Sequence, residues 1–149
     1  MNLFGVLDIS ASGIDAQRKR VEVLAQNIAN SETTRTPEGG PYRRQRVVFE
    51  TGAPGGSFAD TLAAARGGFS SSAPAGVKVS RVETDNTPPE RRYLPDHPDA
   101  GEDGYVEFPG FNPVEDMVDL TASVRSFQAN LAVVSAVKEM LTRTIEVQR

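Results

Sequence analysis

The only histidine of the chain, His97, stands among carboxylates, and these residue types could form a metal site. Asp96 and Asp99 flank it, and Glu102 and Asp103 follow closely. Imidazole and carboxylates can together bind a divalent cation. The spacing matches no calcium-binding loop, however, and one histidine in a chain without cysteine supplies no zinc ligand set. We therefore interpret the segment as a solvated acidic loop and predict neither a metal site nor a cofactor.

Nucleophilic catalysis and phosphate binding also lack a matching pattern. The serines at 70–72 have no Gly-x-Ser-x-Gly context, and the single histidine lies in a proline-rich segment. The glycine pair at 39–40 is not followed by the Lys-Ser or Lys-Thr of a phosphate-binding loop. The sequence therefore predicts a protein that is not an enzyme.

Two groups of arginines stand beside tyrosines, at residues 42–46 and 91–93. Such residues could bind the phosphates of a nucleic acid or stack on its bases. Acids lie close to both groups and the net charge is −4, which disfavours nucleic acid as a partner. A planar guanidinium also suits carboxylates. We therefore expect salt bridges between subunits from Arg43, Arg44, Arg46, Arg91 and Arg92.

The elements that flank these arginines are predicted to be two helices. Both ends of the chain carry apolar residues at the seven-residue spacing of coiled coils. The spacing spans residues 7–28 at one end and, in two neighbouring rows, residues 117–148 at the other. An ordinary antiparallel helix pair within one domain is the alternative, but the second helix is longer than so small a central unit could cover. The predicted assembly seam consists of Leu7, Ile14, Val21, Leu24, Ile28, Val124, Phe127, Leu131, Val134, Leu141 and Ile145.

Helix breakers separate the two ends, because all ten prolines lie within residues 31–113. We predict a first helix over about residues 2–30 and a second that begins at Pro113 after an Asn112 N-cap. Between them we expect short strands at 46–50, 77–83 and 105–108. A Gly/Ala/Ser-rich flexible loop is expected at 52–76, and residues 84–104 are expected to be extended without regular structure.

The expected fold class is therefore α+β, with long N- and C-terminal helices that pair as a coiled coil and a small, irregular, β-rich central unit. We divide the chain into an N-terminal helix at 1–32, a central unit at 33–111 and a C-terminal helix at 112–149. Polar residues interrupt the first apolar stretch, and nothing approaches 18 consecutive apolar residues. We therefore predict no membrane insertion and no cleaved Sec-type signal.

Two stretches of the sequence resemble the family of flagellar rod, hook and axial proteins and, within it, the proximal rod proteins. Residues 24–30 read Leu-Ala-Gln-Asn-Ile-Ala-Asn, and residues 33–44 contain Pro-Glu-Gly-Gly-Pro-Tyr. The likeness resumes at 95–100, 104–106 and 112–120 and continues through 128–141. Phe111 departs from it, since the family usually has a smaller residue there. The matching motif residues are Asn27, Asn30, Thr33, Pro37, Gly39, Gly40, Pro41, Tyr42, Asn112 and Pro113.

The resemblance implies a structural subunit of the proximal rod of the bacterial flagellar basal body, which self-assembles into a helical drive shaft and transmits torque. It implies type III export without a cleaved signal and a place in the periplasmic rod. The implied partners are other copies of itself, other proximal rod proteins, the MS-ring and export-gate side of the base, and the distal rod protein. The alternative is a cytoplasmic coiled-coil adaptor or export chaperone, which would be a soluble dimer.

Overall fold

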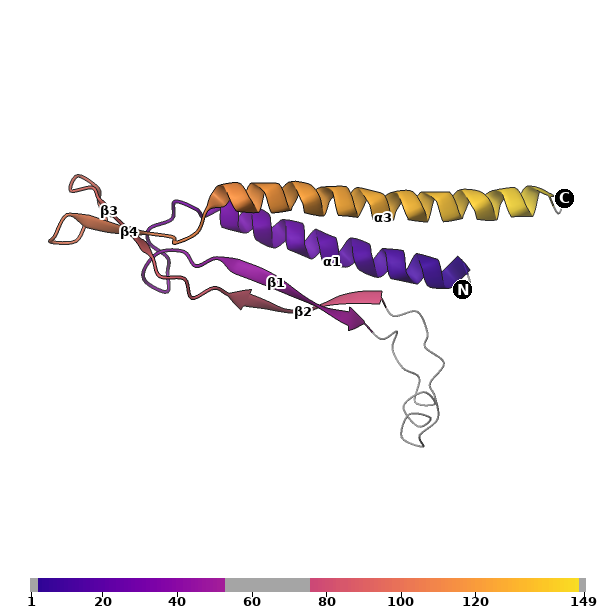
Figure 1. Ribbon diagram of the computed structural model, residues 1–149, viewed down its shortest axis with the longest axis horizontal. Coiled ribbons are helices and arrows are strands. Elements are labelled where there is room, and N and C mark those ends of the chain that lie inside the picture. The colour runs from indigo at the N-terminus through magenta and orange to yellow at the C-terminus, as the bar shows by residue number, and fades with distance from the viewer. Residues whose placement is uncertain (1–2, 53–75, 148–149) are drawn as a thin grey trace, which may run out of the picture. The chain divides into compact units, whose positions relative to one another are not determined.

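A computed structural model describes residues 3–52 and 76–147. Its elements in chain order are α1 (Leu3–Ala29), β1 (Gln45–Gly52), β2 (Gly76–Thr84), β3 (Glu90–Tyr93), β4 (Tyr105–Phe108) and α3 (Pro113–Val147). Figure 1 shows α1 and α3 as two long continuous helices, with the strands between them in sequence. The predicted α+β class is confirmed. Most of the predicted loop at 52–76 lies outside the described residues.

The strands form two separate two-stranded sheets, β1 with β2 and β3 with β4. The second pair is antiparallel, with Glu90 opposite Phe108 and Tyr93 opposite Tyr105. The expectation that residues 84–104 lack regular structure is wrong for Glu90–Tyr93, which is a strand. Its four side chains are all exposed, so the sequence shows no alternation of apolar and polar residues that would predict a strand. The backbone hydrogen bonds of β3 come from its pairing with β4.

The chain divides into two compact units, and both helices contribute to each of them. Unit 1 comprises Met1–Arg18, Phe49–Ser80 and Val124–Arg149, and unit 2 comprises Lys19–Val48 and Arg81–Ser123.

In unit 1 the two helices approach closely at Gly13. A Cβ added there would lie 3.0 Å from Asn130 Nδ2, so the absence of a side chain admits the amide of α3. The backbone N–H of Val77, at the start of β2, donates to Ser12 Oγ at 3.1 Å and ties that strand to α1. Ala16 and Val137 are the buried apolar side chains described in this unit.

In unit 2 the helices run antiparallel, since Asn27 contacts Asp116 and the earlier Arg20 lies 3.6 Å from the later Asp119. Val23, Leu24 and Val106 are its buried apolar side chains. None of the helices in the described part of the chain is both long and apolar enough to cross a membrane.

Candidate assembly site

The end of α1 and the turn after it are closed by the polar residues of the sequence motif. Asn30 Nδ2 donates to the carbonyl of Gln26 at 2.8 Å, which satisfies a carbonyl in the last turn of the helix. Thr33 Oγ1 donates to Asn30 Oδ1 at 3.2 Å, and the N–H of Tyr42 donates to the Thr33 carbonyl at 3.0 Å. The loop that follows α1 therefore returns at Tyr42 to the C-terminal end of that helix.

Two consecutive glycines let that loop close. Gly39 and Gly40 have φ values of +89° and +77°, in the left-handed region that favours glycine. The N–H of Thr36 donates to the Gly40 carbonyl at 2.9 Å, and the N–H of Gly39 donates to the Thr36 carbonyl at 3.0 Å. Pro37 and Pro41 flank the glycine turn and restrict its backbone. The result is a rigid loop that returns Tyr42 to the helix end.

At the other boundary, the predicted start of α3 is confirmed. The N–H of Val114 donates to Asn112 Oδ1 at 3.0 Å, the contact of an N-cap, and Pro113 is the first helical residue. Asp116 lies in the first turn of this helix.

These two boundaries meet in a buried polar cluster, which we call the clasp, formed by Asn27, Tyr42, Arg44, Gln45 and Asp116. Asn27 Nδ2 donates to Asp116 Oδ2 at 3.0 Å and to the Gln45 carbonyl at 2.9 Å. Asn27 Oδ1 accepts from the Tyr42 hydroxyl at 2.9 Å and from the Gln45 N–H at 3.0 Å. The amide of Asn27 thus joins α1, the loop after it and α3.

A charged pair completes the clasp. The Asp116 side chain is fully buried and the Arg44 side chain is 13% exposed, and Arg44 Nη2 donates to Asp116 Oδ1. The Arg44 guanidinium also lies 6.0 Å from the centre of the Phe111 ring, and the rings of Phe111 and Tyr42 pack in a T-shaped arrangement with their centres 6.5 Å apart. Phe111, the departure from the family pattern, therefore helps to cover the buried charges. A buried charge of this kind is tolerated because it is paired and hydrogen-bonded.

Burial of the Tyr42 phenol, and next the nearby carboxylate of Asp116, raise the pKa of Tyr42 above its ordinary value of 10.0. Because the fold favours the protonated phenol, its contribution to stability is complete below about pH 10 and is lost as the pH rises through the folded pKa. We expect the difference between the tyrosinate absorbance titrations of the native chain and Tyr42→Phe to have its midpoint above 10.0. The urea midpoint of Tyr42→Phe should also depend less on pH above about pH 10. A difference midpoint at or below the ordinary value would contradict the burial of the Tyr42 phenol beside Asp116.

Four of the five arginines predicted to bridge subunits form ion pairs with acidic residues of the same chain. Besides Arg44, Arg91 lies 3.1 Å from Glu107 across the β3–β4 ribbon, and Arg92 lies 3.0 Å from Glu90. Hydrogen bonds from Arg92 hold the pKa of Glu90 below its usual value.

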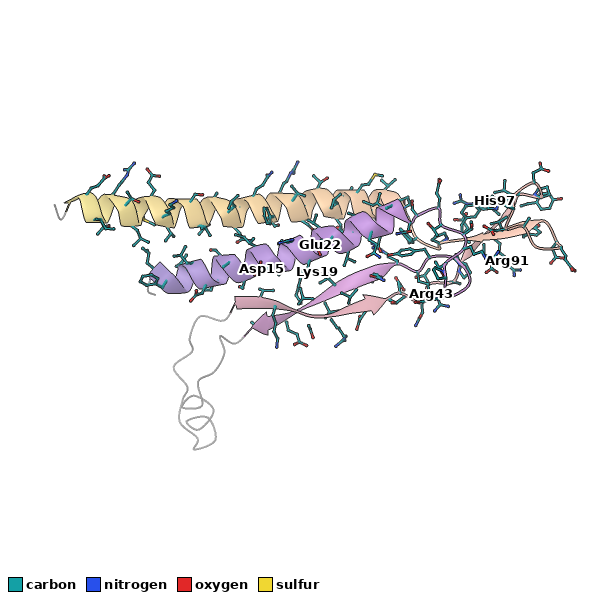
Figure 2. The ribbon with its side chains drawn as sticks, turned by 180° about the vertical axis from the view of Figure 1, so that it is seen from behind. Asp15, Lys19, Glu22, Arg43, Arg91 and His97 are labelled. Carbon is teal, nitrogen blue, oxygen red and sulfur yellow. The ribbon has the colours of Figure 1, made fainter. Side chains whose placement is uncertain are left out.

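Arg46 is likewise 3.3 Å from Asp85. Each of these four arginines therefore has an acidic partner within the chain, and salt bridges from them to other subunits stay predictions. Arg43, labelled in Figure 2, is exposed, and no ion pair to it is seen among the described residues. A bridge from Arg43 to another subunit stays a prediction.

The acidic segment around His97 has a structural role in unit 2. The N–H of Asp99 donates to His97 Nδ1 at 3.1 Å, and the rings of His97 and Phe108 pack in a T-shaped arrangement. Asp99 in turn accepts from Thr34 Oγ1 at 2.7 Å. Within residues 3–52 and 76–147, no three potential metal ligands of the His, Cys, Asp or Glu types converge. The segment thus fastens the loop after β3 to the loop after α1; His97 is labelled in Figure 2.

The residues of the predicted assembly seam differ in how far a single chain covers them. Leu24 is buried, and seven others are half-buried: Leu7, Ile14, Val21, Ile28, Phe127, Val134 and Leu141. The remaining three lie on one row of α3 and are exposed: Val124 by 37%, Leu131 by 49% and Ile145 by 66%. Met117, in the same row, is 50% exposed. One heptad row of α3 is therefore largely covered, and its neighbour is left open.

Family models match both ends of the chain. The family model for the flagella basal body rod protein matches residues 7–35, and the model for the C-terminal part of the flagellar basal body rod FlgEFG protein matches residues 102–147. These matches contain both sides of the clasp, Asn27 and Asp116.

Full-length relatives give the same result. The chain is 40% identical to the flagellar basal-body rod protein FlgC of Bacillus subtilis, with 99% of both chains covered. It is 38% identical to FlgC of Borreliella burgdorferi, covering 99% of this chain and 98% of the relative, and 36% identical to FlgC of Salmonella typhimurium, covering 97% of each. The chain therefore belongs to the FlgC family of flagellar basal-body rod proteins.

Proposed function

We propose that this chain is a structural subunit of the proximal part of the flagellar basal-body rod. It assembles with further copies of itself and with other proximal rod proteins, between the MS-ring and export-gate side of the base and the distal rod protein. Family membership supports the rod assignment. The exposed row of α3 is the single structural observation that carries the role of assembly.

That row has the chemistry of a helix-to-helix contact. Apolar side chains fill four of its five heptad positions, Met117, Val124, Leu131 and Ile145, and each is at least 37% exposed in the single chain. Lys138 occupies the fifth position. Residues 126–137 of the same helix carry no charge at all. A helix surface without charges and with large exposed apolar groups is typical of a protein interface. Neighbouring subunits in a helical tube would cover it, because contacts that do not close into a ring continue as a filament.

A rod subunit of this kind transmits torque through packing and performs no reaction. The polar groups that could have been catalytic are engaged in structure: His97 accepts from the Asp99 N–H, and Arg44 pairs with Asp116. The proposed location is the periplasmic part of the rod, reached by type III export of the uncleaved chain.

Mass spectrometry of detergent-washed hook and basal-body particles from the native cell tests this assignment. We expect the chain there at a fixed ratio to other rod proteins. Its absence from the particles, with abundance in the cytoplasm as a soluble dimer, would overturn the proposal in favour of an adaptor or export chaperone.

A further inference from the structure

The apolar contacts between α1 and α3 specify their relative register weakly. The buried side chains of the two helices, apart from the clasp, are few and mostly small in the described part of the chain: Ser10, Ala16, Val23, Leu24, Ser123 and Val137. An apolar pattern that repeats every seven residues matches a shifted partner nearly as well as the correct one. A separate feature must therefore select one register.

The clasp has the properties of such a feature. Asn27 and Asp116 are the two fully buried polar side chains described in unit 2, and they contact each other across the helix pair. Arg44 approaches the same carboxylate from the segment before β1. A shift of α3 by one turn in either direction would take Asp116 away from Asn27 and Arg44. A shift toward the N-terminus of α1 would also place its charge beside Val23 and Leu24, which are themselves buried. A buried charge without partners is strongly disfavoured, whereas the observed register pairs the Asp116 carboxylate with both Asn27 and Arg44.

We propose that the contact of Asp116 with Asn27 and Arg44 sets the register of α1 against α3. A shift by three or four residues would also turn α3 by about 40–60°, because each residue of a helix advances about 100°. It would thereby change which apolar row stays open. This last consequence rests on the proposed rod function, whereas register selection is a property of the isolated chain.

Disulfide trapping can read the register directly, because the chain has no cysteine of its own. In unit 1 a Cβ built on Gly13 lies 3.3 Å from Asn130 Cγ, so Gly13→Cys with Asn130→Cys places two thiols at bonding range in the native register. Gly13→Cys with Phe127→Cys or with Val134→Cys reports a shift of about one turn in either direction. Each pair is oxidised in the purified full-length chain, and the disulfide yield is measured.

The decisive variant replaces the clasp charges by apolar groups of similar size, as Asn27→Leu, Arg44→Leu and Asp116→Leu together. Such replacement often preserves stability, so the helices should remain paired. We expect the yield of the two shifted pairs, relative to the native pair, to rise at least about tenfold. An unchanged ratio in a helical, folded variant would overturn the proposal and assign the register to apolar packing.

A matched control removes the exposed ion pair between the same two helices, as Arg20→Leu with Asp119→Leu. We expect it to retain the native pair, and a rise of the shifted pairs there would overturn the proposal. If the triple variant loses its helical circular dichroism, the single variant Asp116→Asn is tested in its place, because it removes the charge and keeps the shape of the side chain. Disulfide yields of the two shifted pairs equal to those of the native chain would again refute register selection. Incorporation into basal bodies is scored separately, so failure of the rod assignment leaves the trapping result unaffected.

Discussion

Asp116→Ala is expected to lower the free energy of unfolding by about 3–5 kcal/mol, because it removes one partner of a buried ion pair. The guanidinium of Arg44 would be left 13% exposed without its carboxylate. Asn27 Nδ2 would keep its bond to the Gln45 carbonyl and lose the one to Asp116. Urea unfolding of the isolated chain, followed by circular dichroism at neutral pH, measures the effect.

Asp119→Ala is the matched control on the same helix. Asp119 forms an ion pair with Arg20 in the same unit, at 3.6 Å, but its side chain is 48% exposed. An exposed pair contributes about 1 kcal/mol or less, so we expect a correspondingly small loss. Adding Arg44→Leu to Asp116→Ala should restore part of the stability, since it removes the unpaired charge. Equal losses from Asp116→Ala and Asp119→Ala would show that the clasp contributes no more than a surface pair.

The helices and their boundaries could be predicted because local chemistry determines them. Asn112 and Pro113 indicate the start of α3 through capping and a fixed φ, and the structure places them there. The strand at Glu90–Tyr93 could not be predicted, since its side chains are all exposed and only its register with Tyr105–Phe108 makes it a strand. Its pairing is a tertiary property that the local sequence does not encode.

The clasp shows the same limit at the candidate site. Asn27 and Tyr42 belong to the recognised motif, but Asp116 fits equally well as an acid that complements the dipole at the start of a helix. Asp116 shares its heptad row with Ser123, Asn130 and Val137, and Ser123 and Val137 are buried. A carboxylate in an otherwise inward row requires a buried partner. Which arginine supplies it depends on how residues 33–44 close, and that follows from two glycines at positive φ.

The open row of α3 leads to the second large effect. Leu131→Asp should leave the isolated chain close to native stability, within about 1 kcal/mol, because Leu131 is 49% exposed there. In an assembled rod the same carboxylate would be buried without a partner, at a cost of several kcal/mol. We therefore expect export of the variant to continue while basal bodies lack it and the cells fail to swim in soft agar.

Arg125→Asp is the matched control, because it introduces the same carboxylate six residues earlier on α3 at an exposed position that is already charged. We expect cells with this variant to assemble basal bodies and swim. The comparison separates burial in an interface from the mere addition of negative charge to the helix. Normal swimming with Leu131→Asp, at native amounts of exported protein, would show that the open row makes no contact in the assembled rod. The covered row, which packs against α1, would then be the remaining helix contact of α3.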